Sequence, residues 1–167
     1  MPKTKTEFTV GFTGISGKLT AQQQENVSDE IARLGGSPAK FYSGAATGVD
    51  VLAADTAMGC FPDAKHFVCI PYWRPKDGLF TPCEYDVTGV QELIAAGALA
   101  VHLSALKWCG DDPADGYMRR NLYLATRCTH MLAFPRSKKE ERRSGTWSTI
   151  RRAKKLKRKV KIVPLGG

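Results

Sequence analysis

The chain lacks several features that define whole classes of protein. No apolar run among its 167 residues approaches the roughly 18–20 residues that a helix needs to cross a bilayer. The N-terminus, residues 1–6, is not followed by an apolar stretch of the signal-peptide type. Scattered glycine and proline exclude collagen-like and low-complexity chains. The length suits one domain with a real core, and we expect a cytoplasmic protein with no membrane partner.

Paired metal-binding spacings are also missing. The three histidines, His66, His102 and His130, are isolated in the sequence, so core or surface roles are expected for them rather than metal ligation. The sequence therefore predicts no metal site and no cofactor. The cysteines form an odd set without a CxxC pair, which argues against a disulfide scaffold or a zinc site. We expect reduced thiols, buried or idle, at all five: Cys60, Cys69, Cys83, Cys109 and Cys128.

Acidic residues are scarce in the last quarter of the chain. Residues 136–161 hold thirteen of the 25 Lys and Arg residues but only two carboxylates, Glu140 and Glu141, while the rest of the chain is close to neutral. Such a region attracts nucleic acid, anionic ligands or acidic surfaces. The alternative is a solvated helix face that keeps the protein soluble. A helix predicted over 149–158 has apolar residues at 150, 153 and 156, which indicates one thin buried stripe and a wide cationic face without aromatic residues.

What the sequence does contain is an alternation of strand and helix patterns. Short apolar or alternating runs predict strands at 8–14, 40–43, 66–70, 130–134 and 160–165. Helical spacing predicts helices over 21–34, 49–58, 117–128 and 144–158. The stretch 72–116 is the least legible and shows only an apolar helical piece at Val90–Leu99. The alternation favours parallel strands covered on both faces, so we predict a single α/β, Rossmann-like domain of three layers over residues 1–167, with a mostly parallel sheet.

Three of the strand-to-helix junctions combine glycine with hydroxyl residues. In an open parallel sheet, ligands bind outside the carboxyl ends of the strands. Glycine lets backbone N–H groups approach a ligand closely, and a helix N-terminus favours phosphate. Each junction alone is also consistent with ordinary helix capping, and none matches the GxxxxGK[ST] phosphate loop. The three junctions are Thr13–Gly17, Ser43–Asp50 and Ser144–Trp147.

The second junction resembles a known loop. Residues 43–50, SGAATGVD, are similar to the SGGARGVD loop of the SLOG superfamily, which includes DNA-processing protein A and the Lonely Guy phosphoribohydrolases. Ala45 and Thr47 depart from that loop, where the family has glycine and arginine. Residues 119–121, RRN, and 143–151, RSGTWSTIR, resemble stretches of an uncharacterised bacterial and phage branch. The resemblance spans nearly the whole chain outside the poorly matching segment at about 72–117.

The resemblance implies a Rossmann-like domain whose pocket receives a nucleotide or nucleotide-derived ligand. Our first hypothesis is that the protein acts as a sensor or sequestering module for that ligand, as a homo-oligomer. Asp50 would anchor the second loop or a ribose hydroxyl. The Arg120 guanidinium and the Asn121 amide are suited to clamp a phosphate, although surface charge is the alternative for Arg120. The ligand-binding residues predicted in this way are Thr13, Gly14, Ser16, Ser43, Gly44, Thr47, Gly48, Asp50, Arg120, Asn121, Ser144, Gly145 and Thr146.

Two alternatives to a binding module remain open. Lonely Guy enzymes carry GGxGTxxE, and Thr149 occupies the position of that glutamate here. Cleavage of an N-glycosidic bond builds positive charge on the ribose, so a phosphoribohydrolase needs a nearby carboxylate. Asp50 and Arg120 are the best catalytic candidates, and Asp111, Asp112 and Asp115 offer further carboxylates. The other alternative is a protein that binds single-stranded nucleic acid through residues 136–161.

Overall fold

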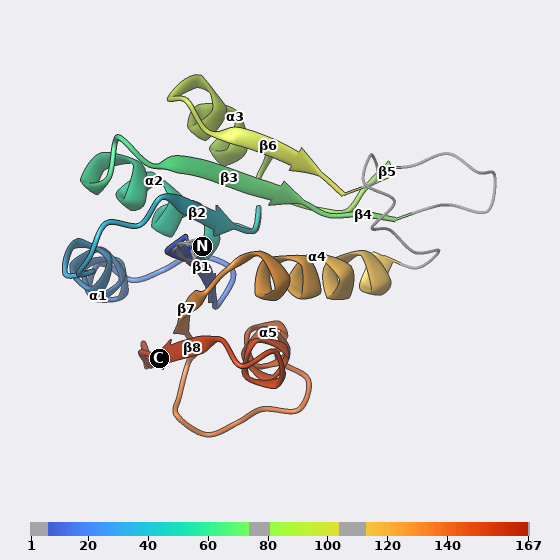
Figure 1. The fold of residues 1–167 in the computed structure, drawn as a ribbon. Coiled ribbons are helices and arrows are strands. Elements are labelled where there is room, and N and C mark those ends of the chain that lie inside the picture. The colour runs from blue at the N-terminus through green and yellow to red at the C-terminus, as the bar shows by residue number, and fades with distance from the viewer. Residues whose placement is uncertain (1–6, 74–80, 104–112, 167) are drawn as a thin grey trace, which may run out of the picture.

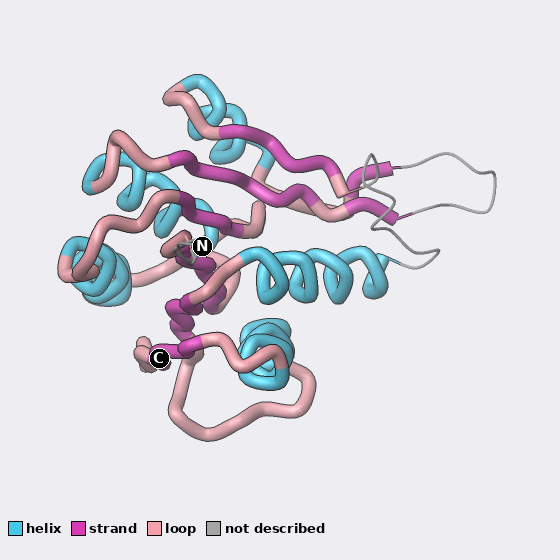
Figure 2. Tube along the Cα trace, viewed as in Figure 1, coloured by secondary structure: helices cyan, strands magenta, loops and turns pink. Residues whose placement is uncertain are grey.

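Short runs of buried residues form the strands of the sheet. The computed structural model describes residues 7–73, 81–103 and 113–166 (Figures 1 and 2). Strand β1 (Thr9–Gly14) is buried at every position but the last, and β7 (His130–Phe134) at every position but the first. Burial of successive residues places both faces of these strands under cover, as in parallel sheets flanked by helices.

Six parallel strands form the sheet in the order β6-β3-β2-β1-β7-β8. The other four are β2 (Lys40–Ser43), β3 (Lys65–Ile70), β6 (Leu99–His102) and β8 (Lys159–Ile162). Strands β2, β3 and β6 follow β1 on one side, whereas β7 and β8 lie on its other side. The carboxyl ends of β1 and β7 therefore form the topological switch point, where ligands bind in sheets of this kind. A separate antiparallel pair joins β4 (Tyr72–Trp73) and β5 (Thr81–Pro82).

The helices cover the two faces of the sheet in two groups. Right-handed crossovers place α1 (Ala21–Ala32), α2 (Val49–Cys60) and α3 (Val87–Ala95) on one face, because their strands progress in one direction. The chain then returns past β1, so α4 (Pro113–Arg127) and α5 (Gly145–Lys155) lie on the other face (Figure 1). This arrangement confirms the predicted three-layer α/β architecture.

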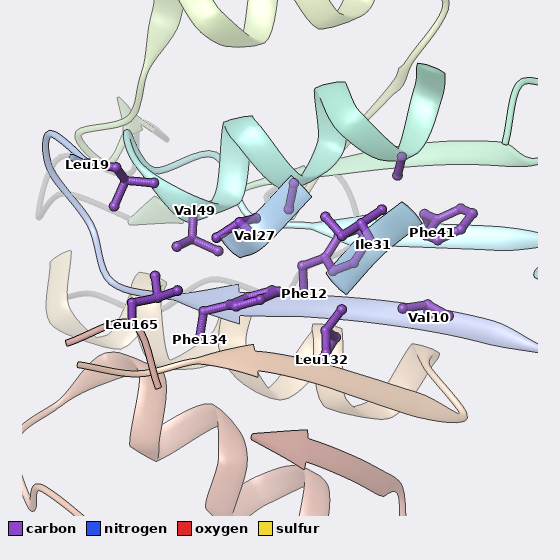
Figure 3. Packing of buried hydrophobic residues seen from close by; sticks show 12 residues of the cluster. Val10, Phe12, Leu19, Val27, Ile31, Phe41, Val49, Leu132, Phe134 and Leu165 are labelled. Carbon is purple, nitrogen blue, oxygen red and sulfur yellow. The ribbon is translucent and has the colours of Figure 1, made fainter. Parts of the chain in front are cut away.

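A buried apolar cluster joins the sheet to the first group of helices (Figure 3). Phe12 of β1 and Phe41 of β2 stack with ring centroids 5.7 Å apart, and both rings are almost completely buried. Val27 and Ile31 of α1 pack on them. On the opposite face, a second cluster packs α4 and α5 against the sheet, which fixes the position of α4 beside the carboxyl end of β1.

Several predicted element boundaries are wrong. The helix expected over 117–128 begins at Pro113, and the strand expected over 160–165 ends at Ile162. The helix expected over Val90–Leu99 ends at Ala95, Gly97 adopts a φ of 114°, and Leu99 begins strand β6. An apolar run alone does not distinguish helix from strand, and here pairing with β3 decides the outcome. The last helix ends at Lys155 rather than at about residue 158, so Leu156 caps the helix and is 39% exposed instead of completing the buried stripe.

Of the four cysteines that the structure describes, Cys69, Cys83 and Cys128 are buried, and Cys60 is exposed. Burial raises the pKa of the Cys128 thiol to about 11, which keeps it protonated near neutral pH. Cys109 lies outside the described residues. Within residues 7–73, 81–103 and 113–166, no helix is both long enough and apolar enough to cross a membrane.

Candidate functional site

A cavity of about 830 Å³ lies at the carboxyl ends of β1 and β7, at the switch point of the sheet. Its volume falls in the range of roughly 300–1,000 Å³ typical of small-molecule sites. The loop after β1, the start of α2, one side of α4 and the turn before α5 form its walls. Ten of the residues predicted to bind a ligand line it: Thr13, Gly14, Ser16, Thr47, Asp50, Arg120, Asn121, Ser144, Gly145 and Thr146.

Three predicted residues do not belong to this lining: Ser43, Gly44 and Gly48. Ser43 is 2% exposed, and its hydroxyl has no hydrogen-bond partner in the described part of the chain. Gly44 lies so close to Asp50 and Arg120 that a Cβ atom would collide with the Asp50 carboxylate. Ser43 and Gly44 therefore lie outside the cavity lining, and Gly44 packs against Asp50 and Arg120, which belong to the lining.

Gly48 joins the loop after β2 to the loop after β1. Its φ of 108° is in the range that favours glycine, and a Cβ atom would lie 2.8 Å from the carbonyl oxygens of Ile15 and Gly17. Gly17 N–H donates to the Thr47 carbonyl at 2.9 Å, and Val49 N–H donates to the Ile15 carbonyl at 3.2 Å. The protein itself accepts the hydrogen bonds of these two N–H groups, so Gly48 serves the contact between the two loops.

A buried ion pair connects α2 with α4 beside the cavity. Arg120 Nη1 lies 3.8 Å from Asp50 Oδ2, and the two side chains are only 12% and 9% exposed. The Ala46 N–H donates to the same carboxylate oxygen at 3.2 Å. Burial nevertheless raises the pKa of Asp50, because loss of hydration outweighs the favourable effects of Arg120 and the Ala46 N–H. Arg120 Nε is buried without a hydrogen-bond partner among the described residues.

One stripe of α4 forms the wall on this side of the cavity. Tyr117, Arg120, Asn121 and Leu124 all line it, and their spacing of three and four residues puts them on one face of the helix. Asn121 Nδ2 lies 3.5 Å from the Gly145 carbonyl oxygen, which connects this stripe to the start of α5. The two predicted motifs, RRN and RSGTW, therefore meet at one wall.

The N-terminus of α5 opens toward the same space. Ser144 caps the helix by accepting a hydrogen bond from the Trp147 N–H at 3.3 Å. The first N–H groups of a helix have no intrahelical acceptor, so those of Gly145 and Thr146 are suited to an anion. A Cβ atom on Gly145 would meet no other atom within 4 Å, so the space in front of it is open. Thr149 is buried and donates to the Gly145 carbonyl at 3.0 Å, which gives it a role within the helix.

Five further cavity-lining residues with charged or aromatic side chains were not predicted: Glu84, Tyr85, Tyr117, Arg136 and Glu141. Glu84 and Tyr85 lie in the stretch 72–116, where no motif marked them. Tyr117 was detectable in principle, because it precedes Arg120 by three residues on a predicted helix. The carboxylates proposed at Asp111, Asp112 and Asp115 have side chains outside the described part of the structure.

Several cations of the basic region are already engaged with the protein. Arg151 pairs with Glu140 at 2.9 Å, and Lys161 pairs with Glu30 at 2.8 Å. Arg158 donates to two main-chain carbonyl oxygens at the end of α4. Part of the positive charge of residues 136–161 therefore fixes the last helix and strand in place, whereas Arg136 lines the cavity.

Comparison with known proteins gives a likeness of fold to a solved structure. No protein-family model and no curated protein matches the sequence. The structure of DNA processing protein A from Streptococcus pneumoniae is similar, with a TM-score of 0.68 and 20% sequence identity over 95% of this chain. The match covers 50% of the pneumococcal chain, so the present chain spans about half its length. The chain therefore shares its Rossmann-like α/β fold with that part of DNA processing protein A.

Proposed function

We propose that the protein binds a nucleotide or nucleotide-derived ligand in the 830 Å³ cavity and acts as a sensor or sequestering module. The observation that carries this proposal is that three glycine-and-hydroxyl turns, distant in sequence, contribute to one cavity that also contains the Arg120 guanidinium. The position at the switch point of a parallel sheet supports the proposal, because ligands of such folds bind there. The likeness to a DNA-processing protein agrees with a role related to nucleotides or nucleic acid.

The phosphate of the ligand lies between Arg120 and the start of α5. Arg120 offers five N–H donors, and its ion-pair contact with Asp50 at 3.8 Å is too long to be a good hydrogen bond. The N–H groups at Gly145 and Thr146 and the positive end of the helix dipole favour the same charge. Arg136 adds a second guanidinium to the cavity. Bidentate contact from an arginine is the usual way in which proteins hold a phosphate.

Gly145 provides the sharpest test, because its position is open and its φ is not in the left-handed range. Gly145→Val extends a side chain into this space, where an added Cβ atom meets no other atom within 4 Å, and Gly145→Ala is the matched control with a smaller side chain. Titration calorimetry with nucleoside monophosphates, cyclic nucleotides and NAD is expected to show binding by the native protein and by Gly145→Ala. Gly145→Val is expected to lose on the order of tenfold in affinity or more. Equal affinity in the folded Val variant would overturn the assignment.

Arg120 provides a second, independent variant. Arg120→Lys keeps a positive charge beside Asp50 but removes the bidentate geometry, so it tests phosphate contact with less damage to the buried pair than Arg120→Ala. We expect weaker nucleotide binding in a protein that still folds, measured by calorimetry and circular dichroism. A short single-stranded oligonucleotide belongs in the same ligand panel. Preferential binding of the oligonucleotide that weakens steeply with salt would assign the site to nucleic acid instead.

A hydrolase is the second candidate, and two carboxylates in the cavity favour it. Glu84 and Glu141 both line the cavity and are exposed, so either could supply the charge that Thr149 cannot. Release of free base from a nucleoside monophosphate, lost in Glu141→Gln or Glu84→Gln but kept in Glu140→Gln, would establish this activity. Binding without any release of base supports the binding module.

A further inference from the structure

We propose that Tyr117 is the base-stacking platform of this site, so that the ligand combines a phosphate with a planar aromatic base. This inference rests on the proposed function and goes further, because it distinguishes a nucleotide from a sugar phosphate. Tyr117 and Arg120 line the same cavity from the same face of α4. Three residues of α-helix correspond to a rise of about 4.5 Å, so the aromatic ring and the phosphate contact lie close to one helical turn apart.

Gly116 fixes the start of this wall. It is buried, and a Cβ atom there would collide with the Tyr72 carbonyl oxygen and lie 2.8 Å from Cys83 Sγ. The absence of a side chain lets α4 approach β4 and the segment after β5 closely. The next residue, Tyr117, is therefore held at a defined position beside the chain at Glu84.

The Tyr117 side chain is held at two further points. Its hydroxyl donates to the Glu84 carbonyl oxygen at 3.0 Å, and the Arg120 guanidinium lies 5.8 Å from the centre of its ring. A cation within about 6 Å of an aromatic ring face is attracted by it. The ring is therefore oriented before a ligand arrives, which lowers the entropy that stacking would otherwise cost. Aromatic rings held in this way bind bases of any identity, because every base presents a π-face.

Other aromatic residues fit this role less well. Trp147, beside the N-terminal turn of α5, is 5% exposed and packs against Ala133 and Ile150, so its ring is not available to a ligand. Tyr85 lines the cavity but is also packed against the cluster beneath α3. Of these three residues, only Tyr117 lines the cavity, has a fixed ring and contacts Arg120, the residue predicted to bind the phosphate.

The experiment compares adenosine 5′-monophosphate with ribose 5-phosphate, which carries the same phosphate and sugar without a base. Affinities are measured by calorimetry for the native protein and for Tyr117→Phe, Tyr117→Leu and Tyr117→Ala. Tyr117→Phe keeps the ring and is expected to retain most of the preference for the nucleotide. Tyr117→Leu and Tyr117→Ala are expected to lose about tenfold in affinity for the nucleotide, in the range measured for base–aromatic stacking, while ribose 5-phosphate binds as before.

The outcomes separate this inference from the function on which it rests. An equal loss of affinity for both compounds in folded Tyr117→Leu would show that the residue only supports the phosphate site, and would overturn the stacking role. Unchanged nucleotide affinity in Tyr117→Leu and Tyr117→Ala, combined with loss in Gly145→Val, would overturn the stacking role and leave the proposed function standing. Failure of the native protein to bind any nucleotide would overturn both.

Discussion

Two walls of the cavity use their polar groups in different ways. The paired loops, residues 14–20 and 44–48, satisfy each other: Gly17 N–H binds the Thr47 carbonyl, and an antiparallel bridge joins Ser16 to Gly48. The helical wall, residues 117–124 with 144–146, instead turns a guanidinium and a helix N-terminus toward the cavity. The motif that stands out most in the sequence, residues 43–50, therefore belongs to the wall whose backbone groups bond to each other. The groups that can contact a ligand come mainly from the helical wall.

The difference has a physical origin. A glycine that must accept a positive φ or a close neighbour is required by the backbone, so it stands out in a sequence whatever the ligand is. A phosphate clamp needs only a suitable donor at the right place, and many sequences provide one. In this chain, the glycine-rich loop at residues 43–50 is therefore stronger evidence of architecture than of ligand contact.

The largest expected effect compares one glycine from each wall. Gly48→Ala forces a side chain into a φ of 108° and against two carbonyl oxygens at 2.8 Å, so we expect the free energy of unfolding to fall by about 2–5 kcal/mol. Gly145→Ala meets no atom within 4 Å and is expected to change it by no more than about 0.5 kcal/mol. Urea denaturation measures both. An equal loss in the free energy of unfolding for the two variants would contradict the difference between the paired loops and the helical wall.

Much of the fold could be predicted because the central strands are short, apolar and bounded by clear breaks. The strands at 40–43 and 130–134 are found where the apolar runs placed them. Strand β6 was missed, because Leu99–His102 continues an apolar helical pattern and becomes a strand only by pairing with β3. Local pattern does not contain that information, since it depends on residues about thirty positions earlier in the chain.

Only part of the candidate site could be predicted from the sequence. Glycine and hydroxyl residues at strand ends identified most of the cavity wall, because position after a strand determines position at the sheet edge. The RRN motif at residues 119–121 gave no indication that the Arg120 side chain is buried against Asp50. Glu84 and Tyr85 reach the cavity from a segment whose course depends on the antiparallel β4–β5 pair, which no sequence pattern marked.

Gly116→Ala tests whether the helical wall also depends on close packing at one point. The added Cβ atom would meet the Tyr72 carbonyl oxygen and Cys83 Sγ, so we expect a loss of about 1–3 kcal/mol in the free energy of unfolding. Gly59→Ala, on an exposed position of α2 with no atom within 4 Å, is the matched control. Displacement of Tyr117 should also weaken nucleotide binding. Unaltered stability and affinity in Gly116→Ala would show that α4 has room to shift.

Asp50 lies where the two walls meet, and its titration is a third test. Because burial raises its pKa above 3.8 in the folded protein, the folded state holds this proton at pH values where the unfolded chain has released it. The free energy of unfolding therefore decreases as pH rises from 3.8 through the folded-state pKa. We expect Asp50→Asn to remove this slope and the exposed Asp55→Asn, on the same helix, to keep it. Urea denaturation at a series of pH values measures the slope, and an identical profile in Asp50→Asn would contradict the assignment.

The smallest expected effect is the contribution of His66 to the pH dependence of stability. His66 lies outside the cavity lining, so its contribution can be compared with that of Asp50 in the cavity. His66 is near the amino end of β3, its ring stacks on Phe41 at 5.1 Å, and its Nε2 lies 2.9 Å from the Phe61 carbonyl oxygen. Burial lowers its pKa from 6.5, so the unfolded chain takes up this proton first and stability falls as pH decreases below about 6.5. This slope has the opposite sign to that of Asp50.

His66→Phe keeps an aromatic ring against Phe41 and removes the titrating group. We expect its stability to be less sensitive to pH just below 6.5 than that of the native protein, with a residual slope from His130, whose pKa burial also lowers. The Asp50→Asn and His66→Phe profiles should differ in opposite directions from the native profile, because one group gains and the other loses affinity for protons on folding. If both substitutions changed the pH dependence of the free energy of unfolding in the same direction, the opposite roles assigned to Asp50 and His66 would be wrong.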